Sequence, residues 1–336
     1  MESIGRLIAL IKQYKKLGID SQIDYDKFYL YSIITHSTAI EGSTVTEVEN
    51  QLLFDEGISA KGKTITEQMM NLDLKAAYEE SIRLAKSHTP FSLEMLKNLS
   101  HLVMKNTGSV YKTALGEFSS AEGDLRLVNV TAGVGGRSYM SYQKVPDKMQ
   151  EFCNWVNTRR VAIMDIAMQY EFCFEAHYRL VTIHPWADGN GRMARLIMNH
   201  LQFEFGLIPT KILKDDKGDY INALIESREK EDTRIFLEFM TREMIKTITS
   251  DIDNYLQSTE DENFLKEDSA EYGKKVKTRE RILQLLSAYP KYTTANLASE
   301  IGVTAKAIEK QLAKLKAEGL IKREGSDRGG YWVVLR

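Results

Sequence analysis

The chain has few of the residues that mark disulfide-stapled or membrane-spanning proteins. It contains only two cysteines, Cys153 and Cys173, and five prolines in 336 residues. Both cysteines lie in apolar segments of helical periodicity, which favours buried, reduced thiols over a disulfide or a metal pair. No run of about eighteen apolar residues is present, and residues 1–17 lack the apolar core and cleavage site of a secretory signal. We therefore expect a cytoplasmic protein with no membrane partner.

Neither sign of charge dominates the chain, but the two signs are unevenly distributed. The formal net charge is -2. Residues 274–336 hold 14 Lys and Arg against 6 Asp and Glu, a net charge of +8, so the rest of the chain carries -10. A basic end on an acidic body indicates that the C-terminal segment contacts nucleic acid or an acidic partner.

Most of the sequence has the three- and four-residue apolar spacing of amphipathic helices. The segments with this spacing are residues 25–40, 69–85, 92–104, 146–156, 163–183, 190–205 and 220–226. Residues 125–142 differ, because alternating apolar residues flank a glycine-rich stretch at Gly133, Gly135 and Gly136. That pattern predicts a short β-hairpin, the main β element of the body. The fold class is therefore mainly α.

The C-terminal segment has the element order of a winged helix-turn-helix. After a polar, acidic stretch at 251–275, expected to be a helical extension leading into a linker, residues 278–288 and 294–301 read as helices. Thr304 then caps a longer helix that ends at Gly319, and residues 320–323 and 331–335 read as two strands of a wing.

Basic side chains of this module suit a duplex. Lys306, Lys310 and Lys314 share one face of the expected recognition helix, and Arg328 lies at the wing tip. These four residues are the candidate DNA contacts. Dimerisation or protein docking, with the lysines simply solvated, is an equal alternative for the module.

Residues 184–195 join a glycine-rich turn to the start of an amphipathic helix. Pro185 disfavours helix at His184, and Asp188-Gly189 and Asn190-Gly191 are turn dipeptides. A helix that begins after such a turn presents unpaired N–H groups and the positive end of its dipole, which together bind anions.

The side chains of this segment sharpen the interpretation. Arg192 and Arg195 share one helix face and suit a polyphosphate. Asp188 can hold a Mg²⁺ on phosphate oxygens, and His184 has a pKa suited to general-base work. Each residue alone has an ordinary structural alternative. Together they indicate phosphoryl or nucleotidyl transfer.

The segment HPWADGNGRMAR resembles the Fic-family motif H-[P or x]-F-x-[D/E]-G-N-G-R-x-x-R, with Trp186 where Phe is usual. The resemblance covers about residues 91–249. It implies a protein adenylyltransferase that uses ATP as substrate and Mg²⁺ as cofactor. The implied roles are a base at His184, a metal ligand at Asp188, an anion hole at Gly189, Asn190 and Gly191, and phosphate grips at Arg192 and Arg195.

The resemblance also assigns the predicted hairpin. Fic proteins carry there a flap that docks the target as an added strand, here Gly136, Arg137, Ser138 and Tyr139. These residues lack the usual His and prolines, and a plain structural ribbon is an equal alternative. Two further residues, Tyr220 and Asn222, lie where the family lines its adenine pocket, although core packing suits Tyr220 equally well.

An inhibitory motif precedes the catalytic segment. Ser37, Glu41 and Gly42 fit the family pattern [S/T]-x-x-x-E-[G/N], and Gly42 is a natural helix end. A carboxylate at a helix C-terminus opposes the helix dipole, by about 0.3–1 kcal/mol, and is better tolerated beside a cation. The resemblance implies that this cation is Arg195.

These features predict an autoinhibited protein adenylyltransferase that transfers AMP to a Ser, Thr or Tyr hydroxyl of a protein target, or of itself. Gly191 favours AMP over phosphate transfer, because the Doc branch has Lys there. The alternative is a DNA-binding regulator whose Fic domain removes AMP or is mostly inactive. The target protein stays unknown, and relatives often form homodimers.

The predicted architecture is a Fic-type helical bundle with a β-hairpin flap, followed by a winged helix-turn-helix. Residues 1–90 form the N-terminal helical region with the inhibitory helix, and residues 91–250 form the catalytic core. Residues 251–275 are the extension and linker, and residues 276–336 are the winged helix-turn-helix.

Overall fold

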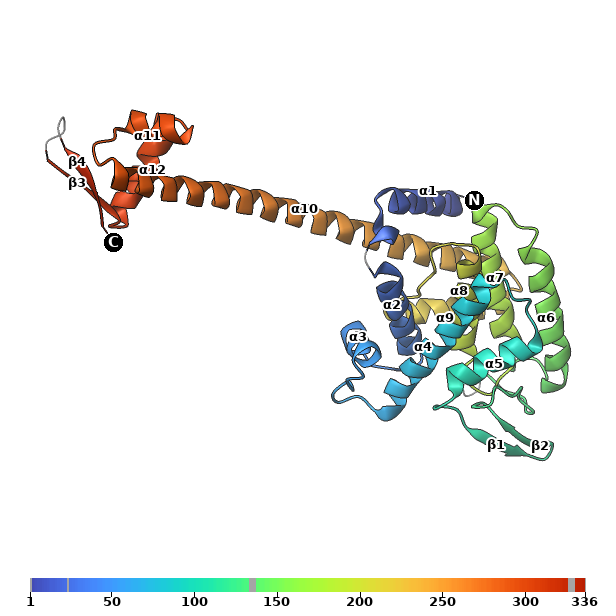
Figure 1. Ribbon diagram of the computed structural model, residues 1–336. Helices are drawn as coiled ribbons and strands as arrows, with labels where there is room; N and C mark the ends of the chain where they lie inside the picture. The colour runs from blue at the N-terminus through green and yellow to red at the C-terminus, as the bar shows by residue number, and fades with distance from the viewer. Residues whose placement is uncertain (1, 23, 133–136, 326–329, 336) are drawn as a thin grey trace. The chain divides into compact units, whose positions relative to one another are not determined.

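A computed structural model describes the backbone of residues 2–22, 24–132, 137–325 and 330–335, and their side chains except those of residues 2 and 260–277. The chain divides into two compact units, Met1–Asp253 and Asn254–Arg336 (Figure 1). Both cysteines are buried and free, as predicted.

The first unit is a bundle of helices. They are α1 (Glu2–Lys16), α2 (Tyr25–Ile40), α3 (Glu47–Asp55), α4 (Ile65–Lys86), α5 (Leu93–Met104), α6 (Val145–Arg160), α7 (Ile166–Ile183), α8 (Asn190–Glu204), α9 (Lys217–Glu229) and the start of α10 (Thr233–Ala288). Short 3₁₀ turns at η1 (Ile19–Ser21), η2 (Tyr142–Lys144) and η3 (Lys214–Asp216) connect some of them. All seven predicted helical segments are helical, and the mainly α fold class is confirmed.

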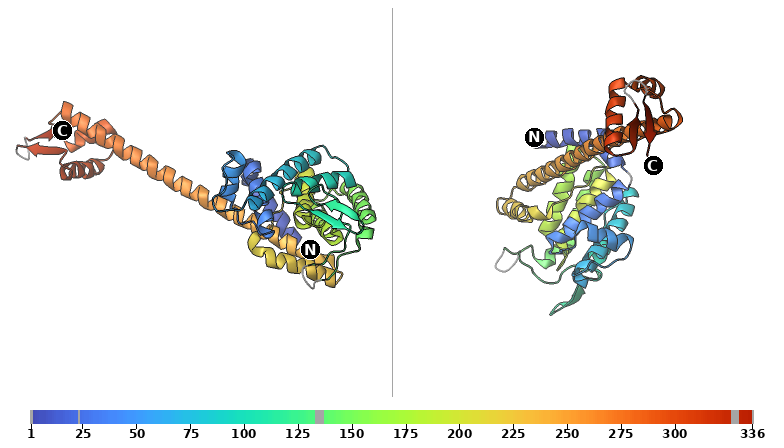
Figure 2. Two further views of the ribbon diagram at one scale, coloured as in Figure 1. Left: turned by 90° about the horizontal axis from the view of Figure 1, so that it is seen from below. Right: turned by 90° about the vertical axis from the view of Figure 1, so that its left-hand side faces the viewer.

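Helix α8 lies at the centre of this unit. It packs against α7, α4 and α5 (Figure 2). Its side chains from Arg192 to Gln202 are all buried, including the fully buried Leu196, Ile197 and Leu201. Because α8 is enclosed on all sides, its N-terminal loop is held rigidly, and that loop carries the segment singled out by the sequence.

The regular β-ribbon of the first unit is not the predicted one. Strand β1 (Val110–Thr113) pairs antiparallel with β2 (Gly116–Ser119). The sequence did not indicate this ribbon, because Ala114 and Leu115 at its turn are not typical turn residues. Gly116, with φ of +127°, provides the left-handed conformation that the turn requires.

The predicted hairpin at 125–142 is antiparallel but much less regular. An isolated bridge joins Thr131 to Ser138, supported by a hydrogen bond from the Tyr139 amide to Val130 O. The prediction that this hairpin is the main β element is therefore wrong. Its glycines Gly133, Gly135 and Gly136 lie outside the described residues.

The second unit has the predicted winged helix-turn-helix order. The end of α10 is followed by α11 (Thr294–Ile301), α12 (Ala305–Ala317), and the antiparallel pair β3 (Ile321–Glu324) and β4 (Tyr331–Val334). Its apolar core contains Ile282, Leu286, Leu297, Ile308, Leu312, Leu315 and Trp332. This unit therefore has a core of its own.

Residues 251–275, predicted as a helical extension leading into a linker, are helical throughout. They form part of α10, and the helix expected at 278–288 is the end of that same helix. The segment 233–288 contains no proline and is rich in Glu, Lys, Leu and Arg, which are good helix formers.

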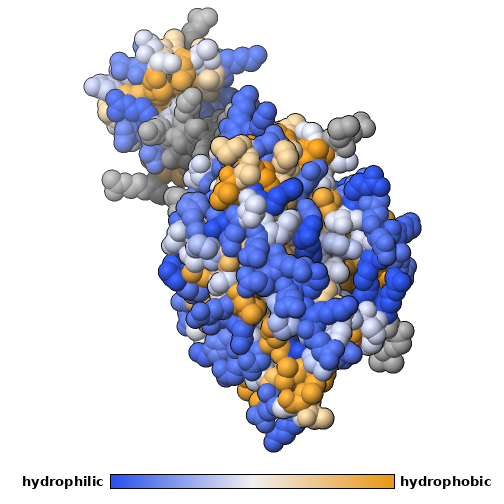
Figure 3. Space-filling model, turned by 90° about the vertical axis from the view of Figure 1, so that its right-hand side faces the viewer, coloured by the Kyte–Doolittle hydropathy of each residue, from blue (hydrophilic) through white to orange (hydrophobic). Residues whose placement is uncertain are grey.

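The polarity of the surface and of the helices bears on whether the chain could span a membrane. The face shown in Figure 3 is largely hydrophilic, with separate apolar patches. Among the residues that the structure describes, no helix combines the length and the apolar character that a membrane span requires.

Candidate active site

The loop between α7 and α8 is folded by its own side chains. Asn190 Oδ1 accepts from the Trp186 amide at 3.1 Å, and Asn190 Nδ2 donates to Trp186 O at 2.9 Å. The fully buried Trp186 donates from Nε1 to Gly123 O at 3.2 Å. Asn190 and Trp186 thus shape the loop, so that their first role is structural.

This loop leads into an anion-binding helix end. Gly189, with φ of +80°, is the N-cap of α8, and the first ladder bond runs from the Met193 amide to Gly189 O. The amides before Met193 have no intrahelical acceptor. A Cβ at Gly189 would lie 2.7 Å from Met104 Sδ, so the close packing requires glycine. The helix end therefore offers N–H groups and a positive dipole to an anion.

His184 lies at the C-terminus of α7, in the left-handed region with φ of +52°. Its Nδ1 lies 3.3 Å from Val181 O, which can only accept, so Nδ1 carries the proton and Nε2 has a free lone pair. The ring stacks on Tyr139 with centroids 3.8 Å apart. Burial lowers the pKa of His184 to about 4, so the imidazole is neutral at pH 7.

Arg195 is the centre of a polar cluster beside the helix end. Its guanidinium is buried and donates from Nε to Ser37 Oγ at 2.8 Å and from Nη2 to Ser37 O at 3.0 Å. Nη2 also lies 2.6 Å from Glu41 Oε1. The structure thus brings together Ser37, Glu41 and Arg195, as the resemblance implied.

Glu41 lies above the N-terminus of α8. It is the C-cap residue of α2, and Gly42 follows with φ of +105°. Partial burial pushes the pKa of Glu41 upward, but the charge and hydrogen bond of Arg195, with Arg192 and Lys217, lower it below its ordinary value. Glu41 is therefore an ionised carboxylate in the position where a bound anion would meet Arg195.

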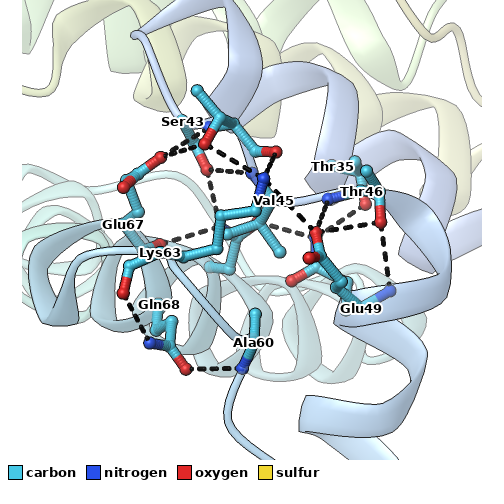
Figure 4. Close-up of polar contacts among 12 residues, drawn as sticks. Thr35, Ser43, Val45, Thr46, Glu49, Ala60, Lys63, Glu67 and Gln68 are labelled. Atoms are coloured by element: carbon cyan, nitrogen blue, oxygen red, sulfur yellow. Dashed lines mark hydrogen bonds and ion pairs between the residues drawn. The ribbon is translucent and has the colours of Figure 1, made fainter.

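A polar clamp holds the loop that follows Glu41 (Figure 4). Glu67 accepts from the amide and hydroxyl of Thr44, both at 2.7 Å, and caps α4 through Thr64. Lys63 Nζ donates to Thr44 O at 2.6 Å. The Thr44 hydroxyl and the Thr64 and Thr44 amides lower the pKa of Glu67 to about 2. The clamp therefore stays charged and fixes the loop at any physiological pH.

Arg192 and Asp188, the other two charged residues of the motif, lie outside the cluster around Arg195. Arg192 is buried, with Nη2 3.0 Å from Met104 Sδ and 3.8 Å from Asp188 Oδ1, and its Nε has no described partner. Asp188 is exposed and accepts from the Gly189 amide at 2.6 Å. Arg192 and Asp188 are therefore close enough to act on one ligand at the helix end.

Tyr220 and Asn222 point to different places. Tyr220 is 2% exposed, and its hydroxyl lies 3.0 Å from His177 Nε2 and 3.4 Å from Arg195 Nη1. Tyr220 thus contacts the Arg195 guanidinium inside the core. Asn222 is exposed on another face of α9, in a groove that it shares with Asp219 and Glu226. The structure does not bring Asn222 together with His184.

A different set of residues forms a pocket beside the Tyr139 and His184 rings. A cavity of about 340 Å³ lies between α7, α9 and the predicted flap. It is lined by Ala132, Tyr139, Tyr178, Val181, Thr182, Ile221, Leu224, Ile225 and Arg228. Arg228 lies over the Tyr139 ring at 5.0 Å. Sequence reasoning placed Tyr139 in the flap but missed Ile221, one residue beyond Tyr220, and Arg228.

The remaining predicted flap residues are less informative. Ser138 takes part in the isolated bridge, and Arg137 is exposed. Gly136 lies outside the described residues. Sequence reasoning also missed Arg126, which is 1% exposed and hydrogen-bonds to His184 O at 2.7 Å.

The candidate DNA contacts lie on the second unit. Lys306, Lys310 and Lys314 are exposed on α12, opposite the buried Ile308 and Leu315. Arg328 lies outside the described residues. The three lysines thus form a solvent-facing basic row.

Two family matches divide the chain in the same way as the fold. Residues 90–202 match the Fic/DOC family, and residues 277–322 match a winged helix-turn-helix DNA-binding family. The chain is 29% identical over 228 residues to the protein adenylyltransferase Fic of Nematostella vectensis, which covers 67% of this chain and 48% of that protein. It is 30% identical over 231 residues to the Drosophila virilis protein of the same name, covering 68% and 43%. The chain thus spans less than half the length of these curated relatives.

Solved structures share the fold. A Fic domain containing signaling protein from Bacteroides thetaiotaomicron has a TM-score of 0.62 at 21% identity, covering 74% of this chain and 95% of that chain. A Fic family protein from Desulfovibrio desulfuricans G20 has a TM-score of 0.59 at 17% identity, covering 100% and 96%. Residues 90–202 are thus a domain of the Fic/DOC family, carried in one chain with a winged helix-turn-helix module.

Proposed function

We propose that this chain is an autoinhibited protein adenylyltransferase, which transfers AMP from ATP to a hydroxyl of a protein. The observation that supports this most directly is the cluster at the N-terminus of α8. There Arg195 lies at an anion-binding helix end and is held by Glu41 at 2.6 Å. The curated relatives that share its sequence are named protein adenylyltransferases.

The site offers ATP two kinds of surface. The triphosphate fits the amides at the start of α8, with Arg192 and Arg195 as cationic groups. The adenine fits the largely apolar pocket of about 340 Å³, where Ile221 and the Tyr139 ring supply flat and aliphatic contacts. His184, stacked on Tyr139, then lies between the adenine pocket and the phosphates.

Asp188 suits a magnesium ligand. Its side chain is 57% exposed, and only Oδ1 is engaged in a described contact, so that Oδ2 can reach a metal. Mg²⁺ is commonly bound by one or two carboxylates together with substrate phosphates, and a single Asp fits that pattern. When bound, the ion would neutralise phosphate charge and orient the phosphates.

The chemistry assigned to the protein is proton removal and charge stabilisation. The target hydroxyl oxygen bonds to the α-phosphorus, its proton passes to the free Nε2 of His184, and the bond from the α-phosphorus to the bridging oxygen breaks. Pyrophosphate leaves with the electron pair. Because burial keeps His184 neutral, the base needs no prior deprotonation at pH 7.

Glu41 acts as the brake in this proposal. Its carboxylate neutralises Arg195 and places negative charge where the γ-phosphate would bind. ATP can still enter, but its triphosphate meets a like charge and one cation fewer. Release of the brake therefore requires that Glu41 leave Arg195.

The test is labelling by the Glu41→Gly variant. With Mg²⁺ and a cell lysate, α-labelled ATP should label protein at least about tenfold faster than with the parent, as loss of a contact worth 1.4 kcal/mol would give. Label that arrives only from γ-labelled ATP would contradict AMP transfer. Equal rates for variant and parent would contradict the brake.

Two controls make the test specific. Glu56 also ends a helix, α3, and also precedes a glycine, yet it has no described ion pair. The Glu56→Gly variant should behave as the parent. His184→Ala in the Glu41→Gly background should abolish labelling.

A second function rests on the winged helix-turn-helix. We propose that the row of Lys306, Lys310 and Lys314 contacts duplex DNA, since the match at residues 277–322 is to a DNA-binding family. The two functions are compatible in one chain, as a braked enzyme held on DNA.

A further inference from the structure

Arg126, itself part of the predicted hairpin segment 125–142, donates to three carbonyl groups, one at the end of α7 and one on each arm of that segment. Its guanidinium donates from Nε to His184 O at 2.7 Å, from Nη1 to Val128 O at 2.7 Å and from Nη2 to Met140 O at 2.6 Å. Its own amide donates to Pro185 O at 3.0 Å. The Arg126 side chain thus links the backbone of His184 to both arms of the predicted flap.

The charge of Arg126 is buried away from acidic side chains among the described residues. The side chain is 1% exposed, and no ion pair is described for it in the part of the chain that the structure describes. Burial lowers the pKa of Arg126. A buried cation without a carboxylate is costly unless its donors are well satisfied, and the planar guanidinium fork does this with three carbonyls. Lysine has no such fork.

His184, which Arg126 contacts, has a strained backbone conformation. His184 has φ of +52°, and a non-glycine residue in this region costs about 1–2 kcal/mol. Its ring also stacks on Tyr139, which belongs to the segment between Val128 and Met140. The orientation of the His184 ring therefore depends on the relative position of α7 and the flap, and Arg126 fixes that position.

We propose that Arg126 is a positioning residue, which fixes the His184 backbone and both arms of the flap to one another so that the base faces a hydroxyl docked on the flap. The inference rests on the proposed function, because it takes His184 as the base. Arg126 acts through His184 and the flap and contacts neither phosphate nor target.

The first test separates turnover from nucleotide binding. In the Glu41→Gly background, Arg126→Lys should lower the initial rate of AMP transfer at saturating ATP by ten- to about a hundredfold, which is what a misplaced catalytic group costs. The affinity for ATP should fall much less than the rate, since Arg126 does not touch the start of α8 and acts on the adenine pocket only through Tyr139. Arg83→Lys, at an exposed arginine paired with Glu80, is the matched control and should keep the parent rate.

The second test needs no AMP transfer. The charged groups that act on His184 are Arg126 and Arg228, which lower its pKa, and Glu41, which raises it. Arg126→Gln removes one of the two cations, so an NMR titration should show a higher His184 pKa than in the parent. The acid limb of kcat/KM should move to higher pH with it. Arg126→Lys keeps the charge but should also raise the pKa, because a loosened flap uncovers the His184 ring and burial is the main cause of its low pKa.

The outcomes are distinct. A slower Arg126→Lys with a much smaller loss of ATP affinity, together with a raised His184 pKa in Arg126→Lys, where the charge is kept, supports the proposal. Rates within twofold of the parent overturn it, as do losses of turnover matched by equal losses of ATP binding or by a collapse in melting temperature. If Glu41→Gly itself transfers no AMP, the proposed function fails, while the His184 titration still reports on Arg126.

Discussion

Glu41 Oε1 lies 2.6 Å from the position that a Cβ on Gly191 would occupy. A side chain at residue 191 would therefore crowd the Glu41 carboxylate, which would have to shift from its present position beside Arg195. The same glycine leaves the helix end open to phosphate. Lysine at this position, as in the Doc branch, would be incompatible with Glu41 as it lies. The AMP-transfer and autoinhibition proposals thus both depend on the absence of a side chain at residue 191.

ATP should stabilise the released enzyme more than the parent. A ligand at a hundred times its Kd stabilises a folded protein by about 2.7 kcal/mol. If Glu41 competes with the γ-phosphate for Arg195, a given concentration of Mg²⁺ and ATP should raise the melting temperature of Glu41→Gly by several degrees more than that of the parent. Glu56→Gly is the control. Identical shifts in all three proteins would show that Glu41 does not compete with nucleotide.

Loosening the clamp should release the brake in part. Glu67→Gln keeps the size of the side chain but removes the carboxylate that accepts from Thr44 and Thr64. The loop after Glu41 is then held less firmly, although Lys63 still donates to Thr44 O, while Arg195 keeps its partner. We expect AMP transfer above the parent rate, by about two- to fivefold, and below that of Glu41→Gly.

The control for the clamp is Glu80→Gln, which breaks an exposed pair with Arg83 elsewhere on α4. It should transfer AMP at the parent rate. A Glu67→Gln variant that stays at the parent rate, with an unchanged melting temperature, would mean that the clamp does not hold Glu41 in place.

Acid should destabilise the fold in a defined pH window. Burial lowers the pKa of His184 to about 4, lowers that of His200 to about 3, and lowers that of His177 well below its ordinary value. Between about pH 6.5 and these values the unfolded chain binds protons that the folded chain does not. The free energy of unfolding should therefore be fully present above pH 6.5 and fall as the pH drops toward 4.

The size of this effect can be checked. A shift of His184 from 6.5 to about 4 corresponds to about 3 kcal/mol at the acid end of the window. Urea unfolding at a series of pH values measures it, and His200→Gln or His184→Gln should each flatten the slope. A slope that the substitutions leave unchanged would contradict the assignment to these histidines.

The basic row of α12 should give salt-dependent binding to duplex DNA. The combined Lys306→Gln, Lys310→Gln and Lys314→Gln variant of the full chain should lose affinity on every sequence and lower the slope of log K against log salt by up to about three. A matched set on α1, Lys12→Gln, Lys15→Gln and Lys16→Gln, removes the same exposed charge. Absence of duplex binding by the parent at low salt would favour protein docking by this module.

The sequence was most informative where the relevant residues are adjacent in the chain. The turn, the helix start and the charged side chains all lie between His184 and Arg195, so spacing alone placed them on one helix end. The predicted range of α2 matches the structure from Tyr25 to Ile40. The winged helix-turn-helix was equally legible, because Thr304, Gly302 and Gly319 mark the ends of its helices.

It was least informative where burial and distant contacts decide. Residues 251–275 were predicted to pass from a helical extension into a linker, but the helix continues unbroken, because the acidic segment contains no proline. The β1–β2 ribbon has neither a typical turn dipeptide nor clean alternation, so no local signal marked it. Asn222 seemed close to the nucleotide pocket by its place in the chain, but it lies on another face of α9.

The sequence by itself therefore determined the glycine-rich loop, the helix that begins after it and the place of His184 before it, because these depend on local backbone chemistry. Only the tertiary structure decided which distant side chains contact these residues. Glu41 reaches Arg195 across 154 residues, and Arg126 reaches His184 across 58. Such contacts leave no periodic trace in a single sequence, because they arise from the packing of α2 and the flap against the buried α7 and α8.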